Sequence, residues 1–352
     1  MRALRTVFVA LALLAVPHAV AGLGDPAAEI VAAVASFEPQ PSGDGYVAAN
    51  DFHFAIESEQ GVATSVTGAG TLTDANVRFV GALLGAASGY GSDIAGPIAD
   101  FFRTRAGDLL GAGELPIQVL EFDLLATVEG PTPGVLSFVF EPQVVDESLF
   151  PATSHYLGSR TARYVIRFFS DFQCPFCADY VEKVMPALEA SVLQRDDVRF
   201  EMHHFPLRSI HPNANVAAEA AECVAQENGA DSFWTYHDAL FAQQARWSGL
   251  IDPVDTLVAL AAEQGLATAD MSACLRTGRL GDVVESAYVA ASQGLLLTGT
   301  PTVFLNGLKV GDYSDIDSYL RLMRLSDALG SAAEDAAAGG PGPASEDGDQ
   351  AP

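Results

Sequence analysis

Residues 164–177 read YVIRFFSDFQCPFC: a strand-like apolar run leads directly into two cysteines separated only by Pro175 and Phe176. Pro175 suits the first position of a helix, where its missing N–H would have no partner anyway. The free amides and the dipole at a helix N-terminus favour a thiolate. We therefore expect Cys174 to be an exposed nucleophile. Cys177, one turn further on, should be the more buried resolving thiol of a disulfide-exchange reaction.

Two other interpretations of this cysteine pair are a zinc half-site and an inert structural disulfide. Structural zinc usually takes a second close pair of ligands, whereas Cys223 and Cys274 each stand alone in the sequence. A Cys-x-x-Cys at a strand-to-helix junction is also less typical of an inert bridge. His203, His204 and His211 have no clustered cysteine or suitably spaced acid, so we expect them to be structural. The sequence indicates no metal and no cofactor.

The second half of the chain alternates strands and helices. The expected elements are a strand over 163–170, a helix over 174–194 kinked at Pro186, a strand over 197–205, helices over most of 212–293, a hairpin formed by 302–305 and 308–310 around Asn306-Gly307, and a helix over 316–329. This order predicts an α/β, thioredoxin-like domain over residues 163–330 with a helical insertion at about 212–293.

A second motif, Gly299-Thr300-Pro301-Thr302, stands just before the last strand pair. A proline after small residues and before a strand often marks a cis peptide bond, although taken alone it is equally consistent with an ordinary turn. In a thioredoxin-like fold this segment would lie beside the cysteine pair. There the backbone of Thr300 would pair with an extended substrate chain, as in strand addition. We therefore expect Thr300, Pro301, Pro175 and Phe176 to contact the substrate.

The first half of the chain has no cysteine and no chemical motif. The expected elements are a helix over 24–36, strands over 44–58 and 61–72, loosely specified helices over 74–111, and a hairpin of 115–128 with 133–142. These elements predict a small α+β domain over residues 22–142, and residues 143–162 read as a linker.

Both ends of the chain have a distinct composition. Residues 1–21 combine Arg2 and Arg5, an apolar stretch and Ala19-Val20-Ala21, which together are typical of a cleaved export signal. An uncleaved anchor is the alternative, but the apolar stretch is shorter than the roughly 20 residues that a bilayer requires. Residues 331–352 are rich in Ala, Gly, Pro and acids, so we expect a disordered acidic tail. The net charge of −27 argues against nucleic acid as a partner.

The chain resembles the DsbA-like family of thiol–disulfide oxidoreductases over about residues 155–325. Four segments carry the resemblance: Phe169-Ser170-Asp171-Phe172-Gln173-Cys174-Pro175-Phe176-Cys177; His204-Phe205-Pro206-Leu207 with His211-Pro212-Asn213-Ala214; Phe233-Trp234, Tyr236-His237-Asp238 and Leu240-Phe241; and Gly299-Thr300-Pro301-Thr302-Val303-Phe304-Leu305-Asn306-Gly307. The resemblance implies that Cys174 is the nucleophile, that Cys177 resolves, that Pro301 is the cis-proline, and that Cys223 and Cys274 form a second disulfide.

Two residues depart from the family pattern. Members often carry a buried Glu six residues before the first cysteine, where this chain has Phe168. The strongest oxidants of this type have Pro-His between the cysteines, where this chain has Pro-Phe. We therefore expect a less extreme reduction potential, with the direction of the redox reaction left open among oxidase, isomerase and reductase.

The leading functional hypothesis is an exported enzyme, periplasmic or extracellular, that exchanges disulfides with exported proteins that contain cysteines. An unidentified redox partner, such as a membrane protein, would recharge it. The alternative is an envelope docking protein in which the N-terminal domain does the work and the thioredoxin-like half is a scaffold.

Overall fold

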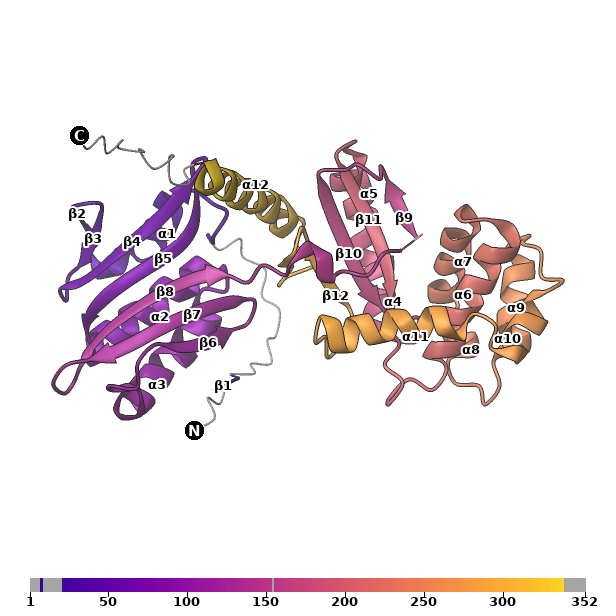
Figure 1. Ribbon diagram of the computed structural model, residues 1–352, viewed down its shortest axis with the longest axis horizontal. Helices are drawn as coiled ribbons and strands as arrows, with labels where there is room; N and C mark the ends of the chain where they lie inside the picture. The colour runs from indigo at the N-terminus through magenta and orange to yellow at the C-terminus, as the bar shows by residue number, and fades with distance from the viewer. Residues whose placement is uncertain (1–6, 9–20, 154, 339–352) are drawn as a thin grey trace, which may run out of the picture. The chain divides into compact units, whose positions relative to one another are not determined.

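The computed structural model describes residues 7–8, 21–153 and 155–338 and contains two compact units, whose elements are labelled in Figure 1. The first unit comprises the chain up to Pro142 and from Arg321 onward, and the second comprises Gln143–Leu320. Each unit has its own β-sheet. Among the described residues, no helix is both long enough and apolar enough to cross a membrane.

The first unit is built on an eight-stranded sheet in the order β1-β6-β7-β8-β5-β4-β3-β2. Its strands are β1 (Val7–Phe8), β2 (Gln40–Ser42), β3 (Gly45–Ala48), β4 (Phe52–Glu59), β5 (Val62–Thr71), β6 (Leu115–Val119), β7 (Phe122–Glu129) and β8 (Val135–Pro142). All neighbours are antiparallel except β1 and β6. Buried and partly buried residues alternate along β7, which is the pattern of a sheet with one face in the core.

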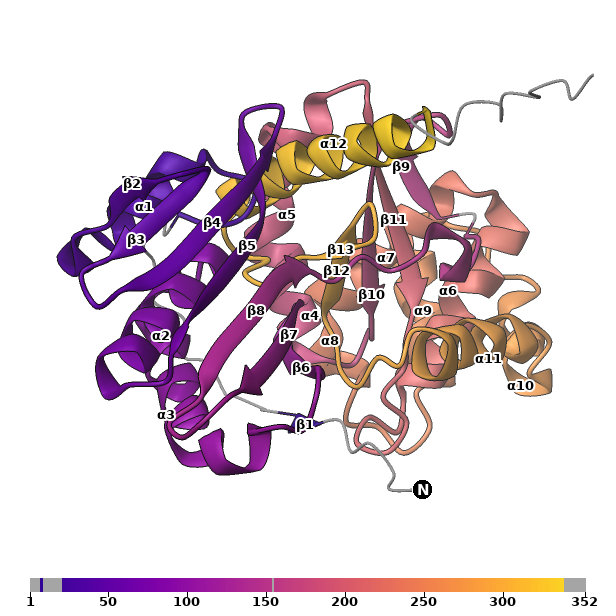
Figure 2. The same ribbon diagram turned by 60° about the vertical axis from the view of Figure 1, so that its left-hand side comes forward.

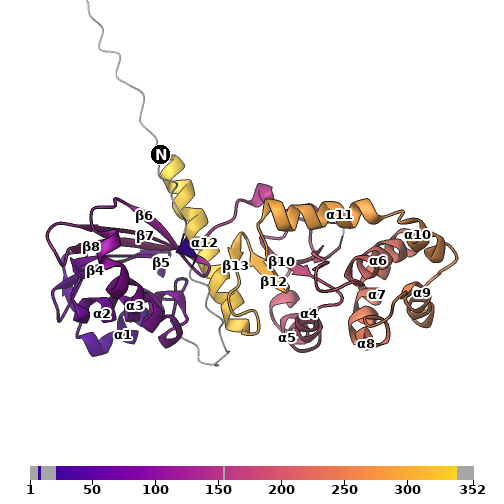
Figure 3. The same cartoon turned by 90° about the horizontal axis from the view of Figure 1, so that it is seen from below.

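Three helices, α1 (Ala27–Ala33), α2 (Asp74–Ser88) and α3 (Ser92–Leu109), cover one face of this sheet, and the 3-10 turn η1 (Ala35–Phe37) follows α1 (Figure 3). The glycines that made this region look loosely specified have a packing role. A Cβ on Gly81 would collide with the carbonyl oxygen of Ala95, and one on Gly85 with that of Gly91. Glycine therefore allows α2 and α3 to approach closely.

The second unit has a five-stranded sheet in the order β13-β12-β10-β11-β9. Its strands are β9 (Tyr156–Gly158), β10 (Tyr164–Ser170), β11 (Val198–His204), β12 (Thr302–Leu305) and β13 (Leu308–Lys309). The central strand β10 is buried along its whole length, runs parallel to β11 and runs antiparallel to β12. The register pairs Ser170 with His204, so the two parallel strands end together.

Helices cover both faces of this second sheet (Figure 3). On one face lie α4 (Pro175–Asp179), the π-turn η3 (Tyr180–Val184), α5 (Met185–Ala190) and the 3-10 turn η4 (Val192–Gln194); on the other lie α11 (Gly281–Val289) and the π-turn η5 (Ala290–Gly294). Phe168 stacks on Tyr180 at 4.4 Å, whereas Phe169 packs with Ala291 on the opposite face. The helix expected over 174–194 is interrupted by η3 just before Pro186, because proline cannot donate the backbone hydrogen bond that a regular helix needs there.

The insertion forms a helical cluster of α6 (Ala214–Asn228), α7 (Asp231–Ala242), α8 (Gln244–Trp247), α9 (Val254–Glu263) and α10 (Met271–Thr277) (Figure 2). The aromatic residues of α7 serve as its core: Phe233 and Tyr236 are fully buried, and His237 and Phe241 nearly so. The predicted thioredoxin-like fold with a helical insertion is confirmed, as is the presence of a separate N-terminal sheet domain.

The structure differs from the expected boundaries at both ends of this domain. The segment predicted as a linker contains the 3-10 turn η2 (Glu147–Leu149) and the edge strand β9, which pairs with β11. The last helix, α12 (Ile316–Ala338), passes into the first unit at Arg321. Within that unit Arg324 donates a 3.0 Å hydrogen bond to the carbonyl oxygen of Gly24.

The expectations for the two ends of the chain fall partly outside the described residues. Residues 331–338, predicted as disordered, continue α12, because their alanines have high helix propensity. The remainder of the predicted tail, 339–352, lies outside the described residues. So does the predicted export signal, apart from Ala21 and β1.

Two strands expected in the first unit are each divided in two. Asp51 and Leu120 both adopt positive φ, at 57° and 56°, and the chain reverses direction at these points. The expected strand over 44–58 is therefore the hairpin β3–β4, and the expected strand over 115–128 is the hairpin β6–β7.

Candidate redox site

The cysteine pair lies at the N-terminus of α4, directly after the central strand β10. Cys174 is the N-cap residue, in extended backbone conformation, and Pro175 takes the first helical position. The amide of Cys174 donates to the carbonyl oxygen of Asp171 at 3.0 Å, and Ala178 donates to the carbonyl oxygen of Cys174 at 3.2 Å. Both Cys174 and Cys177 are free thiols.

Both cysteines are buried, which corrects the expectation of an exposed Cys174. Cys174 is 2% exposed and Cys177 is fully buried. The sulfur of Cys174 lies 3.5 Å from the carbonyl oxygen of Thr300, which helps to cover it. The exposed side chains of the motif are Pro175 and Phe176, and Phe176 is 63% exposed. A substrate would therefore meet Phe176 and Pro175 at the surface before it reaches the sulfur.

The surroundings make the two thiols unequal. The pKa of Cys174 is lowered to about 6, chiefly by a hydrogen bond from the Cys177 thiol and further by hydrogen bonds from Thr300 and the first backbone amides of α4, while burial opposes this change. The pKa of Cys177 is raised well above its ordinary value by burial and by the neighbouring Cys174 sulfur. At neutral pH the reduced pair therefore carries one thiolate, on Cys174, which accepts a hydrogen bond from the protonated Cys177 thiol.

Phe168, six residues before Cys174, is apolar and is buried against the ring of Tyr180. Two residues further along β10, on the same face, Ser170 is 1% exposed, and its hydroxyl has no oxygen or nitrogen partner within the described residues. The Ser170 side chain and the backbone amide of Asp171 instead favour the thiolate of Cys177 and oppose the rise in its pKa. Ser170 therefore belongs to the site although the sequence did not single it out.

The second predicted motif lies against the first. The Thr300–Pro301 peptide bond is cis, and Thr302 begins β12. The carbonyl oxygen of Thr300 faces the Cys174 sulfur, as described above, and the side chain of Thr302 donates to the carbonyl oxygen of Gly299 at 2.8 Å. Residues 126 positions apart in the chain are thus adjacent in the site.

Asp171 ties together the loops around the cysteines. Its buried carboxylate accepts hydrogen bonds from the amides of Gln173 at 2.7 Å and Leu207 at 2.8 Å, and it pairs with His211 at 2.7 Å. Gln173 in turn accepts from the amide of Asn213 at 2.7 Å. These contacts explain why the sequence segments around 169–177 and 204–214 belong to one structural unit.

The other two cysteines form a disulfide between α6 and α10. Cys223 and Cys274 are both buried, with Cα atoms 6.2 Å apart. The bridge holds two helices of the insertion together and does not involve Cys174 or Cys177.

The histidines do have acidic partners, contrary to the reading of the sequence. His203 pairs with Glu201 at 3.1 Å and His204 with Glu222 at 2.9 Å, in addition to the pairing of His211 with Asp171. No spacing in the sequence connects Glu222 with His204, because Glu222 lies 18 residues further on, in a helix of the insertion.

These features define a thioredoxin-fold protein with a Cys-x-x-Cys pair facing a cis-proline loop. Residues 151–324 match the family model described as Thioredoxin. This segment is a thioredoxin-fold domain.

Three similar proteins show how much of the chain is matched. A Na(+)/H(+) antiporter, NhaA 3, of Salinispora tropica is 31% identical over 160 residues, which cover 45% of this chain and 22% of that protein. A Rickettsia typhi protein named as a candidate protein-disulfide oxidoreductase is 21% identical over 165 residues, covering 47% and 58%. The crystal structure of Wolbachia pipientis alpha-DsbA1 is 20% identical, with a TM-score of 0.45, covering 54% and 98%. The chain thus spans less than two thirds of the two curated relatives.

Proposed function

We propose that this protein is an exported thiol–disulfide oxidoreductase that exchanges disulfides with cysteine-containing exported proteins. The observation that supports this best is the asymmetry of the pair: the pKa of Cys174 is lowered to about 6 and that of Cys177 is raised. A nucleophilic thiolate beside a protonated resolving thiol is the arrangement that thiol–disulfide exchange requires.

The proposed oxidation of a substrate has two steps. A substrate thiolate attacks the sulfur of Cys174 in the Cys174–Cys177 disulfide, so a mixed disulfide forms and Cys177 leaves as a thiolate. A second substrate thiolate then attacks the substrate sulfur of the mixed disulfide, and Cys174 leaves as a thiolate. The substrate loses two electrons as it gains a disulfide, and the pair gains the same two electrons. The Ser170 side chain and the Asp171 amide favour the Cys177 thiolate in the first step.

The surface beside Cys174 suits an extended substrate chain. Pro175 and Phe176 are exposed on one side of the sulfur, and the cis-proline loop of Thr300 and Pro301 lies on the other. We infer that these four residues hold the substrate backbone while the sulfurs exchange.

The lowered pKa of Cys174 bears on the direction of the reaction. A stabilised thiolate stabilises the reduced pair, and a stabilised reduced pair is a stronger oxidant than one made of ordinary thiols. We therefore infer that the pair donates disulfides rather than reducing them. Phe176 contributes no charge to the thiolate, so the potential should be less oxidising than that of a pair with a Pro-His dipeptide.

The deciding experiment measures the reduction potential of the Cys174–Cys177 couple in glutathione buffers, beside assays of insulin reduction and of refolding of reduced ribonuclease. The proposal requires an oxidising potential and loss of the refolding activity in Cys174→Ser. A matched control is Cys223→Ala with Cys274→Ala, which removes the other bridge and should retain the activity. A Cys174→Ser protein with unchanged activity would contradict the proposal.

One observation supports a second role, carried by the N-terminal unit. That unit contains a small apolar pocket of about 30 Å³ between α3 and the strands β6 and β7. Its lining includes Ile98, Phe102 and Leu124. A docking module would use such a pocket for a small apolar side chain of a partner. If Cys174→Ser left the role of the protein in cells intact, this docking role would be the main one.

A further inference from the structure

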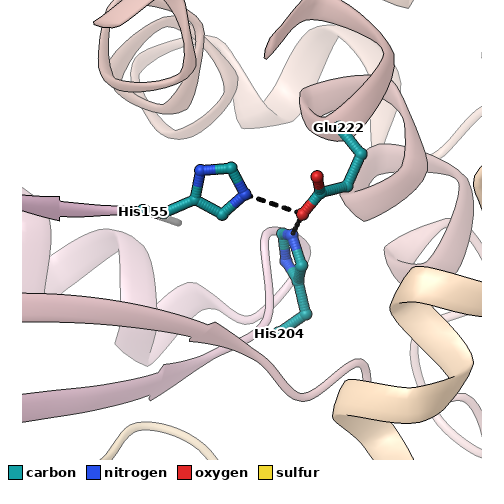
Figure 4. A group of neighbouring side chains, drawn as sticks. All are labelled: His155, His204 and Glu222. Carbon is teal, nitrogen blue, oxygen red and sulfur yellow. Dashed lines mark hydrogen bonds and ion pairs between the residues drawn. The ribbon is translucent and has the colours of Figure 1, made fainter. Parts of the chain in front are cut away.

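A second cluster of polar side chains lies where the strands β9 and β11 meet the helix α6. It consists of His155, His204 and Glu222 (Figure 4). The Nε2 atom of His155 lies 2.7 Å, and that of His204 2.9 Å, from the same carboxylate oxygen, Oε1 of Glu222. All three potential ligand atoms lie within 4.8 Å of one another.

Three separate elements bring these residues together. His155 directly precedes β9, His204 ends β11, and Glu222 lies on α6. The side chains of both histidines are about 5% exposed, and that of Glu222 is 13% exposed. Phe233 stacks on the His155 ring at 3.5 Å, which holds that imidazole in place. The cluster is therefore prearranged and almost completely shielded from water.

We propose that His155, His204 and Glu222 form a binding site for a divalent transition metal, with Zn²⁺ as the first candidate. Two imidazole nitrogens and one carboxylate oxygen are a known three-ligand set for zinc, in which water or another small ligand takes the fourth position. Imidazole ligands also suit Cu²⁺, Ni²⁺ and Fe²⁺, whereas Mg²⁺ and Ca²⁺ prefer oxygen alone. No part of this proposal depends on the redox function of the cysteines.

The charges of the cluster favour a cation. Glu222 is ionised: burial alone would raise its pKa, but hydrogen bonds from His155 and His204 hold the pKa well below its ordinary value. The neighbouring His237 interacts electrostatically with both histidines, and burial lowers its pKa, which favours its neutral form. With neutral imidazoles the cluster therefore carries one negative charge, and a divalent metal would leave one positive charge, which the negative charge of the whole chain offsets in part.

Metal binding requires a small rearrangement of the present hydrogen bonds. Ligands about 2.1 Å from a tetrahedral zinc lie about 3.4 Å from one another, so the two contacts to Glu222 would lengthen by roughly half an ångström. Each imidazole would also carry its proton on Nδ1 rather than on Nε2. These Nδ1 atoms are buried and have no hydrogen-bond partner within the described residues. Lower pH should weaken binding, because a protonated imidazole cannot act as a ligand.

The test is a zinc titration of the full chain with Cys174 and Cys177 oxidised to a disulfide, so that no free thiol competes. Isothermal titration calorimetry should give one equivalent of bound Zn²⁺. The affinity should fall more than about 100-fold in Glu222→Gln and in His155→Gln, since loss of even an outer-shell partner costs about 10- to 100-fold. The matched control is His53→Gln, which removes an exposed histidine of the first unit and should bind as the wild type does.

Two further measurements distinguish zinc bound at this cluster from zinc bound elsewhere on the chain. Co²⁺ in place of Zn²⁺ should give a visible absorption spectrum without the thiolate charge-transfer band that cysteine ligands produce. Zn²⁺ should raise the Tm of the wild type and of His53→Gln but not that of the two ligand variants. If Glu222→Gln fails to fold, the zinc affinity of His155→Gln tests the proposal instead. Absence of zinc binding to the oxidised wild type, or equal binding by both ligand variants, would overturn the proposal and leave the cluster as a hydrogen-bonded tie between β11 and α6.

Discussion

Replacing Cys177 by Ala should raise the pKa of Cys174, because the largest contribution to the acidity of Cys174 is the hydrogen bond that it receives from the Cys177 thiol. The ordinary pKa of a cysteine is 9.0, and in this site the pKa of Cys174 is about 6. At pH 7 about 90% of Cys174 is therefore thiolate, compared with about 1% for an ordinary thiol. The difference between these two pKa values also determines how the stability of the reduced protein depends on pH.

The sign of that dependence follows from the direction of the pKa change. A pKa that is lower in the folded state stabilises the reduced folded protein fully above pH 9, and this stabilisation is lost as the pH falls through 6. Its upper limit is about 4 kcal/mol, and about 1.4 kcal/mol of it is present at pH 7. An effect of about 1.4 kcal/mol on the reduced form corresponds to roughly 30 mV in the potential of this two-electron couple.

A hydrogen bond to a charged group contributes about 1.5–3 kcal/mol, so its loss in Cys177→Ala should move the midpoint up by roughly one to two pH units. The ultraviolet absorbance of the thiolate, followed against pH in the reduced protein, measures this midpoint directly. Cys177→Ser keeps a hydroxyl donor and should recover part of the effect. A midpoint near 9 in the wild type, or an unchanged midpoint in Cys177→Ala, would refute the assigned role of the Cys177 thiol.

Three other sites give measurable expectations. Cys223→Ala with Cys274→Ala should lower the free energy of unfolding by roughly 4 kcal/mol in the chain-entropy model, since the bridge spans 51 residues. Urea unfolding measures this loss, and an unchanged unfolding midpoint would contradict the expected stabilisation by the bridge. Asp171→Ala leaves two backbone donors and His211 without their acceptor, so we expect the free energy of unfolding, measured in urea, to fall by at least about 2 kcal/mol. Asp171→Asn should partly restore the stability. Equal stability of the two variants would argue against the role of the carboxylate. Phe176→His places an imidazole on the exposed position between the cysteines and should make the couple more oxidising; a glutathione equilibrium that does not shift would count against electrostatic control of the thiolate.

The parts of the fold that could be predicted from the sequence are those with local signals. The largely apolar run of β10, broken only by Arg167 before Ser170, predicts a buried strand, and Pro175 predicts the start of α4. Asn306-Gly307 predicts the turn between β12 and β13, where both residues adopt positive φ. Each of these signals depends only on residues that are neighbours in the chain.

The features that were missed depend on contacts between distant residues. His155 is 67 residues from Glu222, so no spacing rule could connect them. The burial of Cys174 depends on Thr300, which is 126 residues away. The edge strand β9 is short and partly exposed, and its assignment follows from its pairing with β11 rather than from its composition.

The alternation of β10 also determines which of its side chains face the helix that carries the cysteines. Successive side chains of a strand point to opposite faces, so Phe168 and Ser170 face α4, whereas Arg167 points to the other face and pairs with Glu201 at 3.2 Å. Arg167 is thereby kept on the face of the sheet opposite α4, and the carboxylate of Asp171 is occupied by Gln173, Leu207 and His211. The side chain that favours the Cys177 thiolate is the neutral Ser170. Because a hydroxyl does not titrate in the working range, the pH dependence of exchange should follow the substrate thiol together with the two thiols of the pair, and the midpoint that the protein itself contributes should be that of Cys174.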